Sequence, residues 1–316
     1  MKNGKKELLR RLDAAQHCAE SGRLGRFLAA PWRYFSTMYF LHYSYPRKKE
    51  GKFVTATPFF GLPMRLVLPS GADIYITGAK SHNSELRLAR YMVNQLKSGH
   101  QVLDVGAHLG YFTLLAARLV GEKGRVVAVE AAKSTYNILA QNVDKQPFVS
   151  VMNCCLSDSD EEQTFYEFPI LYNEYNTLLP AQFEQQDWQK NNPPRAVQVK
   201  SLTLSQLIEQ TGLRPDFIKI DVEGAEDKVI AGAAAWLTDL PFAQRPTIVL
   251  EYLAADRQNQ PHQKAKELLE SFGYTAFIID KKGKLKACED IETYLLRQQL
   301  DSDNIVFSFA APESKA

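Results

Sequence analysis

A glycine-rich turn between an apolar segment and a helical segment constrains the fold of this chain more than any other feature. The turn spans residues 104–110 (Asp-Val-Gly-Ala-His-Leu-Gly), after the apolar pair Val102-Leu103 and before residues 111–120, which have the composition of a helix. In an α/β sheet, such glycines form the tight turn that binds a nucleoside-like ligand above the strand ends. The sequence therefore predicts a parallel sheet with a ligand site after its first strand.

An acid that follows the turn narrows the choice of ligand. Glu130 ends the apolar segment 125–130, where a carboxylate takes the ribose hydroxyls of a nucleoside. A dinucleotide would need a second glycine where His108 stands, because its phosphates must approach the backbone closely. Asp104 would repel a diphosphate but attract the α-amino group of a methionine moiety. We therefore expect S-adenosylmethionine as the cofactor and not NAD.

Strand and helix signals alternate across residues 81–316, which we expect to form the catalytic domain. Continuous apolar strands need helices on both faces, so the predicted fold is α/β, a doubly wound Rossmann-like sheet of seven main strands. The predicted helices are 81–96, 111–120, 134–143, 202–211, 225–237 and 264–272. The predicted strands after Val102-Leu103 are 125–130, 149–155, 217–221, 247–252, 275–280 and 305–309, with a short extra strand at 164–168.

Three further regions are predicted around this pattern. Residues 1–50 form a basic, aromatic and helical extension, and residues 51–80 contain small antiparallel strands at 53–57, 64–68 and 73–77. Residues 169–195 are rich in Asn, Gln, Tyr and Pro and lack periodicity. Substrates are usually selected by a long irregular loop over a parallel sheet, so we expect this loop to contact the acceptor.

Charge is distributed unevenly along the chain. The net charge of +2 gives no reason to expect nucleic acid as a partner. Residues 1–50 carry eleven Lys or Arg against four Asp or Glu, and residues 26–45 combine aromatics with Arg. Such a segment packs on its own domain, covers a cleft as a lid, or contacts a membrane peripherally. No apolar run has the length of a membrane span and no apolar signal core begins the chain, so we expect a cytoplasmic protein without a transmembrane segment.

Two sequence blocks resemble the FkbM-type group of class I S-adenosylmethionine-dependent methyltransferases, over roughly residues 85–275. The first comprises residues 102–113, then 121–126 leading to Glu130, then 156–158. The second and more specific block is residues 217–226 (Phe-Ile-Lys-Ile-Asp-Val-Glu-Gly-Ala-Glu), with Gly232 after it. The resemblance implies a seven-stranded sheet whose last strand is antiparallel. It also implies methyl transfer, typically to a hydroxyl of a sugar or small metabolite.

The resemblance further implies a set of cofactor contacts. Asp104, Gly106 and Gly110 would line the methionine end of S-adenosylmethionine, Glu130 the ribose, and Asp158 the adenine edge. Glu85, on the helix before the first strand, matches an acid of the family. The expected cofactor-binding residues are Glu85, Asp104, Gly106, Ala107, His108, Gly110, Tyr111, Glu130 and Asp158.

Catalytic candidates follow from the strand ends. Asp221 and Glu251 close adjacent strands and could project over the cofactor's methyl group, with Asp221 as base or acceptor ligand. Lys219 lies two residues before Asp221 on the same strand face, so it either forms a structural ion pair or orients the acceptor. Glu223 is the fourth candidate, and His108 is an alternative base.

No metal is expected, although Asp221 with Glu251 offers the hard oxygen ligands of a divalent-cation site as an alternative. The four cysteines show no metal-ligand spacing and agree with a reducing compartment. The preferred acceptor is a small molecule or glycan, with its hydroxyl on a sugar, glycolipid precursor or secondary metabolite. The alternatives are methylation of nitrogen, or of a protein or lipid, and a cofactor-binding protein without catalysis.

Overall fold

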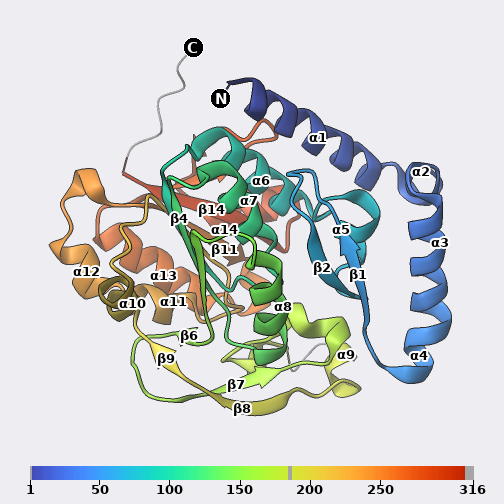
Figure 1. Ribbon diagram of the computed structural model, residues 1–316. Helices are drawn as coiled ribbons and strands as arrows, with labels where there is room; N and C mark the ends of the chain where they lie inside the picture. The colour runs from blue at the N-terminus through green and yellow to red at the C-terminus, as the bar shows by residue number, and fades with distance from the viewer. Residues whose placement is uncertain (1, 184–186, 310–316) are drawn as a thin grey trace.

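The computed structural model describes residues 2–183 and 187–309, and one large sheet organises it (Figure 1). The strand order is β13-β12-β14-β11-β10-β3-β4-β5. Five strands run parallel, and β14 runs antiparallel to its neighbours β11 and β12. The bounds are β3 Gln101–Val105, β4 Arg125–Val129, β5 Val149–Met152, β10 Phe217–Ile220, β11 Thr247–Leu253, β12 Thr275–Ile279, β13 Leu285–Ala287 and β14 Ser302–Ser308.

The predicted seven-stranded sheet with an antiparallel last strand is confirmed, with one addition. β14 is the last strand in the chain and lies between β11 and β12. The eighth strand, β13, forms a hairpin with β12 at the sheet edge. Its three residues are mostly exposed, so they lack the apolar run by which the other strands were predicted.

Alternate residues of the central strands enter two separate cores, which makes the fold doubly wound. Val102 and Phe217 belong to the core on one face, and Leu103 and Ile218 belong to the core on the other. Because successive strand side chains point to opposite faces, each face needs its own helices. One face is covered by α6 (Asn83–Gln95), α7 (Tyr111–Val120) and α8 (Lys133–Val143), and the other by α10 (Leu204–Thr211), α11 (Glu226–Ala231), α12 (Ala234–Asp239), α13 (Gln260–Ser271) and α14 (Ile291–Gln298).

The helix predicted at 225–237 is divided into α11 and α12 at Gly232. A Cβ at this position would lie 2.2 Å from the backbone oxygen of Ser157, so only glycine lets the helix end pack there. Gly232 also contacts the start of α10, because Ser205 donates its amide and hydroxyl hydrogens to the Gly232 backbone oxygen. The division therefore results from a close tertiary contact that periodicity does not show.

The strand predicted at 73–77 is wrong, because this segment is helix α5 (Ala72–Thr77). β1 (Lys52–Ala56) and β2 (Met64–Leu68) do form the predicted antiparallel pair. Asp73 accepts hydrogen bonds from the amides of Ile74 and Ser81, and Gly78 ends the helix with φ +81°. In so short a segment, these local hydrogen bonds outweigh the strand-like alternation of apolar residues.

The strand predicted at 149–155 leaves the large sheet after Met152. Residues Cys155–Leu156 form β6, which pairs with β9 (Ser201–Leu202). The extra strand predicted at 164–168 is β7 (Gln163–Glu167), and its partner β8 (Arg195–Val199) was not predicted. Between β7 and β8 lie η2 (Ile170–Tyr175), η3 (Pro180–Phe183) and α9 (Asp187–Lys190), within the predicted irregular loop.

The N-terminal extension is helical, as predicted, and lies at one edge of the molecule (Figure 1). The first helix, α1 (Lys2–Glu20), packs along α6 and contributes Leu8 and Leu12 to the core. The chain then continues through α2 (Gly22–Ala29), α3 (Pro31–Tyr39), the π-helical turn η1 (Phe40–Ser44) and α4 (Tyr45–Lys48). None of the helices in the described residues is long and apolar enough to traverse a bilayer.

Candidate active site

A cavity of about 360 Å³ opens at the carboxyl ends of β3, β4, β10 and β11. Many of its lining residues were predicted from the sequence: Glu85, Gly106, His108, Glu130, Asp221, Glu223 and Glu251. A smaller cavity beside it shares Gly106, His108 and Asp221 and adds Ala107, Tyr111 and Lys219. Of the predicted site residues, all of which lie in the described part of the chain, Asp104, Gly110 and Asp158 line neither cavity.

Gly106 allows the end of β3 to turn directly against the end of β10. Its φ is +74°, and a Cβ there would lie 1.8 Å from the backbone oxygen of Asp221. That oxygen belongs to the strand end itself, so a side chain at position 106 would displace the acid. The glycine therefore sets how closely the turn and Asp221 approach each other.

Gly110 and Tyr111 do not line the main cavity, and their contact with the cofactor stays a prediction. Gly110 is the N-cap of α7 with φ +89°, and a Cβ there would lie 2.6 Å from Leu139 Cδ1. The Tyr111 ring packs edge-on against Phe60 and Phe112 and reaches only the smaller cavity. The packing at the start of α7 thus explains why a glycine stands at position 110 and an aromatic residue at position 111.

Glu130 joins two loops at the cavity wall. One carboxylate oxygen accepts a hydrogen bond from the His108 amide at 2.8 Å. The other accepts from the Ala132 amide at 3.0 Å and from Thr135 Oγ1 at 2.7 Å. Burial raises the pKa of Glu130, and these hydrogen bonds oppose that shift. The carboxylate thus fixes the turn while its outer edge lines the cavity.

The His108 ring is neutral and faces the loop after β7. Burial is the main cause that lowers its pKa to about 3, and the charge of Lys80 adds to the effect. One ring nitrogen, Nε2, lies 3.2 Å from Asn173 Oδ1. A group with so low a pKa is a weak proton acceptor, so the alternative of His108 as the base is disfavoured.

Lys219 has carboxylate partners on both sides, as a buried lysine requires. Its Nζ lies 3.0 Å from Asp221 Oδ2 and 3.7 Å from Asp104 Oδ1. The second oxygen of Asp104 accepts a 2.6 Å hydrogen bond from Thr113 Oγ1. Burial alone would lower the pKa of Lys219, but the two carboxylates raise it overall. Asp104 lines neither cavity. Its carboxylate instead pairs with Lys219.

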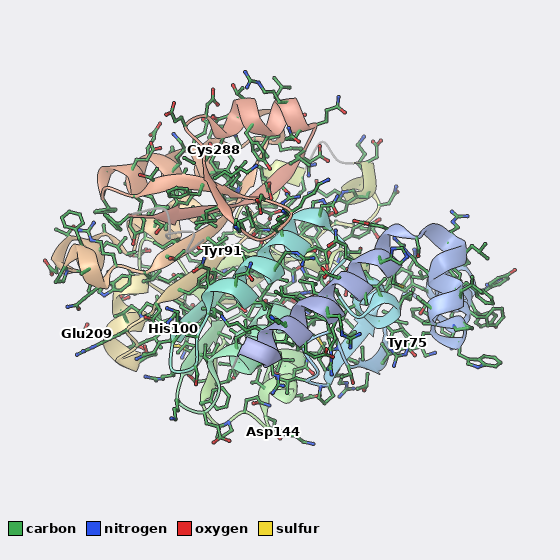
Figure 2. All side chains as sticks on the ribbon, turned by 90° about the horizontal axis from the view of Figure 1, so that it is seen from above. Tyr75, Tyr91, His100, Asp144, Glu209 and Cys288 are labelled. Atoms are coloured by element: carbon green, nitrogen blue, oxygen red, sulfur yellow. The ribbon has the colours of Figure 1, made fainter. Side chains whose placement is uncertain are left out.

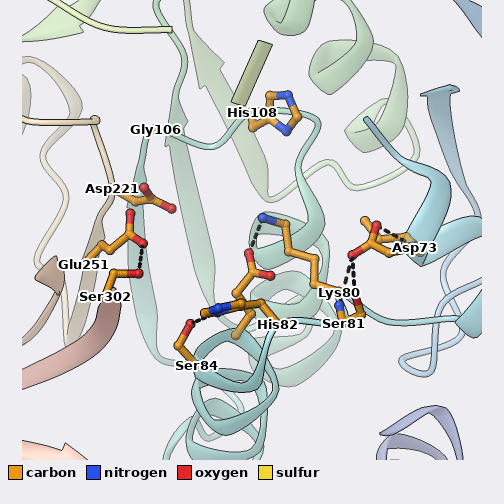
Figure 3. A network of polar contacts seen from close by, with 12 residues as sticks. Asp73, Lys80, Ser81, His82, Ser84, Gly106, His108, Asp221, Glu251 and Ser302 are labelled. Carbon is orange, nitrogen blue, oxygen red and sulfur yellow. Dashed lines mark hydrogen bonds and ion pairs between the residues drawn. The ribbon is translucent and has the colours of Figure 1, made fainter. Parts of the chain in front are cut away.

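Three carboxyl groups converge where β10 and β11 end, and they differ in protonation. Asp221, Glu223 and Glu251 have oxygens within 4.8 Å of one another. Burial would raise the pKa of Asp221, but Lys219 and Lys80 hold it below its ordinary value. Burial, and then the charge of Asp221, raises the pKa of Glu251 to about 8. Asp221 and Glu251 lie beside each other (Figure 3). At neutral pH Asp221 is therefore ionised and Glu251 is protonated.

The carboxyl trio also has the spacing of a cation site, which the sequence offered only as an alternative. Oxygen ligands of this kind suit magnesium or calcium. Lys219, however, already neutralises one oxygen of Asp221, and Ser302 donates a 2.8 Å hydrogen bond to Glu251. The side chains thus satisfy one another within the protein, and the expectation of no resident metal stands as a prediction.

Lys80 is a second cation at the cavity that sequence analysis did not find. It follows α5 and forms an ion pair with Glu85 at the start of α6 (Figure 3). The charges of Glu85, Glu174 and Asp221 raise its pKa despite burial. Burial raises the pKa of Glu174 to about 7. No motif marked Lys80, since it lies between α5 and α6, far along the chain from Glu174 and Asp221.

Comparison with known proteins identifies the family. The model of the FkbM methyltransferase domain matches residues 104–276, more than half of the chain. This protein belongs to the FkbM methyltransferase family. The sequence-based resemblance is thereby confirmed, and with it S-adenosylmethionine as the cofactor of a methyltransferase of this family.

Relatives of the FkbM chain match over part of their length. A Caenorhabditis elegans protein-L-isoaspartate O-methyltransferase is 28% identical over 120 residues, which are 37% of this chain and 50% of that protein. Methyltransferase sdnD of Sordaria araneosa is 28% identical over 166 residues, 45% of this chain and 63% of that protein. The chain thus spans between half and two thirds of these curated relatives.

Solved structures resemble the FkbM chain more distantly. A Bacillus cereus O-methyltransferase in complex with SAH superposes with a TM-score of 0.37 at 16% identity, covering 70% of this chain and 78% of that one. Aeropyrum pernix fibrillarin, with natively bound S-adenosyl-L-methionine, gives a TM-score of 0.37 at 12% identity, covering 70% and 73%.

The residues of this FkbM chain fit the cofactor. Gly106 leaves the strand end free of a side chain, and the Glu130 carboxylate lines the cavity after β4. Acids attract a sulfonium and an ammonium, and the carboxylates of Glu85 and Asp221 provide that charge. The apolar wall suits a nucleobase and consists of Val129, Cys154, Leu156 and Phe165.

Asp158 lines neither cavity, and its contact with the adenine edge of the cofactor stays a prediction. Its side chain is exposed and accepts a 2.9 Å hydrogen bond from Ser157 Oγ. The chain leaves the large sheet at β6, which turns Cys154, Cys155 and Leu156 toward the cavity instead.

In the second FkbM block, Glu226 fixes the position of Glu223. Glu223 has φ +54°, and Glu226 holds this turn by accepting hydrogen bonds from the amides of Val222 and Gly224. His262 Nε2 lies 3.1 Å from the same Glu226 carboxylate, and Thr177 Oγ1 donates to the Glu223 backbone oxygen. Sequence analysis ascribed no role to His262. Its position in α13, far from the motif along the chain, left no signal.

Proposed function

We propose that this chain is an active S-adenosylmethionine-dependent methyltransferase that methylates a hydroxyl oxygen of a sugar, a glycolipid precursor or a secondary metabolite. The observation that carries the proposal is the ionised Asp221 at the cavity floor, held by Lys219 on one oxygen. In the proposal, an acceptor hydroxyl donates its hydrogen bond to this carboxylate, which Glu251 also contacts. Glu251, protonated beside it, keeps the negative charge of the pair at one.

The cofactor supplies a methyl group already activated by a cationic sulfur, so alignment and proton removal are left to the protein. A hydroxyl becomes strongly acidic as its oxygen bonds to carbon, and a carboxylate is then a sufficient base. In the proposed reaction, Asp221 takes the hydroxyl proton, Lys219 holds Asp221 in place, and Glu223 and Glu251 orient the acceptor. The loop after β7 lines this site with Asn173 and Tyr175.

The outer part of the cavity supports an acceptor with several hydroxyl groups. Asn173, Glu174 and Asn176 line it from the loop after β7, and Arg257 lines it from the other side. These groups donate and accept hydrogen bonds in fixed directions, as polyols require. Trp188 stacks on Tyr172 with ring centroids 4.3 Å apart and supports this loop from behind.

Amine acceptors are the weaker candidate for a specific reason. The acids around Asp221 would hold an amine as its ammonium ion, which has no lone pair with which to attack. The isoaspartate methyltransferases among the relatives leave a protein carboxyl as the second candidate acceptor. A cytoplasmic location belongs to the same proposal, because all four cysteines are free.

Two measurements test the proposal. Calorimetry should show binding of S-adenosylmethionine and S-adenosylhomocysteine but not NAD. A cell extract incubated with the protein and methyl-labelled cofactor should yield a labelled small molecule that base treatment does not hydrolyse, since ethers survive base and methyl esters do not. Label confined to protein, or lost in base, would refute hydroxyl methylation.

A further inference from the structure

We infer that α2, α3 and η1 form a docking surface for an anionic membrane. The molecule has eleven exposed large hydrophobic side chains among its described residues, and most of them gather on this short segment. We call this set the aromatic surface, and its members are Leu24, Phe27, Leu28, Trp32, Phe35, Tyr39 and Tyr43. Isolated exposed hydrophobics are ordinary, but a concentration of this kind marks an interaction site.

Helical periodicity places the aromatic side chains of α3 and η1 on one outward stripe. Trp32, Phe35, Tyr39 and Tyr43 recur at intervals of three or four residues, and Trp32 is 85% exposed. The opposite side faces the body of the protein, where Thr37 and Phe40 are buried. Tyr39 and Tyr43 stack on each other with ring centroids 5.4 Å apart. The stripe is therefore left outside the fold by the packing of the helix itself.

The inner side of the segment is fastened to the protein, so the surface is presented by a fixed support. Arg33 lies over the Tyr75 ring at 5.3 Å and donates a hydrogen bond to the Tyr75 backbone oxygen. Phe40, Tyr45 and Leu68 form a small core beneath η1. Figure 2 shows the segment at the rim of the molecule, with Tyr75 beside it and side chains projecting outward.

Charge identifies the partner. Residues 22–52 contain seven Lys or Arg and one acid, Glu50. Arg47, Lys48 and Lys49 are exposed where the aromatic stripe ends. A groove between η1 and β1 combines Phe35 and Tyr39 with Lys48 and Lys52. Aromatic residues that sit at the headgroup level, bordered by Lys and Arg, are the chemistry of an anionic bilayer surface. A second copy of this chain would bring two basic surfaces together.

Vesicle sedimentation of the full chain tests the inference. Vesicles of phosphatidylcholine with phosphatidylglycerol, at about 7:3, should bind at least about tenfold more protein than phosphatidylcholine alone, and high salt should weaken binding. Trp32→Ser/Phe35→Ser should reduce binding about tenfold, because the two serines no longer bury apolar surface in the bilayer. Lys48→Glu/Lys52→Glu should reduce it similarly while leaving the stripe intact.

Leu296→Ser is the matched control, since Leu296 is 79% exposed on α14, outside the aromatic surface. It should sediment like the unaltered protein, and all variants should keep the circular dichroism of the unaltered chain. Absence of binding to the anionic vesicles, or equal loss in Leu296→Ser, would overturn the inference. So would light scattering that shows a dimer which Trp32→Ser/Phe35→Ser converts to a monomer, without vesicle binding by either.

Discussion

Lys219 Nζ lies 3.0 Å from Asp221 Oδ2. The two residues are two positions apart, so their side chains lie on the same face of the chain where β10 ends. Asp104 reaches the same ammonium group from β3, which pairs with β10 in register. The proposed base is therefore coupled to the cofactor turn through one buried cation. This relationship makes the roles of the acid and of the lysine separable by experiment.

Asp221→Asn should lower turnover by roughly a hundredfold or more while S-adenosylmethionine binding is retained. The amide keeps the shape of the carboxyl group but cannot accept the proton. Labelled methyl transfer and calorimetry measure the two properties. Asp239→Asn, at an exposed position on α12, is the control for a lost acid elsewhere. Undiminished turnover in Asp221→Asn would remove this residue from the mechanism.

Lys219→Met should shift the acid limb of the rate profile to higher pH. The ammonium holds the pKa of Asp221 below its ordinary value, so its removal raises that pKa, and the base is protonated over a wider range. The buried carboxylate of Asp104 and the partly buried carboxylate of Asp221 also lose their partner, which should cost about 3–5 kcal/mol of stability. Turnover is measured across pH at saturating cofactor. A fall in turnover with an unmoved acid limb would assign Lys219 a purely structural part.

The raised pKa of Glu251 predicts how the free energy of unfolding depends on pH. Its pKa is raised from 4.5 to about 8 in the folded protein. Between these values the folded state binds one more proton than the unfolded chain, so the free energy of unfolding falls as pH rises, by up to about 1.4 kcal/mol per pH unit. Urea unfolding should show this fall in the unaltered protein and a flatter dependence in Glu251→Gln. An equally steep fall in the variant would contradict the assignment.

Chelation should leave methyl transfer unchanged. The pKa values of Glu223 and Glu251 are both raised by burial and by their acidic neighbours, so Asp221 is the one ionised carboxylate of the trio at neutral pH, and Lys219 already pairs with it. A divalent cation would find too little negative charge here. Turnover is compared with and without EDTA, and then with added magnesium. A loss on chelation that magnesium restores would instead establish the carboxyl trio as a metal centre.

Gly106→Ala should destabilise the protein more than Gly212→Ala does. Both glycines have positive φ, so both variants strain the backbone. Only at Gly106 does the new Cβ meet an atom within 4 Å, the Asp221 oxygen at 1.8 Å, whereas at Gly212 it meets none. The difference in unfolding free energy isolates that clash and should reach about 1–3 kcal/mol. Equal effects would show that the turn can relax away from β10.

Much of the fold followed from periodicity, because buried parallel strands and amphipathic helices have patterns that tertiary contacts seldom override. Val102-Leu103 and residues 217–221 are examples, since both cores require them to be apolar. Failures occurred where local hydrogen bonds decided the outcome. Asp73 and Gly78 made a helix of an alternating segment, and the contact of Gly232 with Ser157 divided another helix.

The site was predictable where its residues end strands and not where they lie between elements. Glu130 and Asp221 follow β4 and β10, and Glu251 lies near the end of β11, so the parallel topology brings all three to the same edge of the sheet. Lys80 and His262 reach the site region from other elements, and their approach depends on how α5 and α13 pack. Asp158 shows the converse. It belongs to the motif but lines neither cavity, because β6 just before it pairs with β9 outside the large sheet.

Helix α5 has one further consequence. The N-terminal helices α1, α2 and α3 all rest on it, and the chain runs from its C-terminal end through Ala79 into Lys80. A membrane bound at α3 would thus press on a helix that contacts α5, and α5 ends three residues before Lys80 and its ion pair with Glu85.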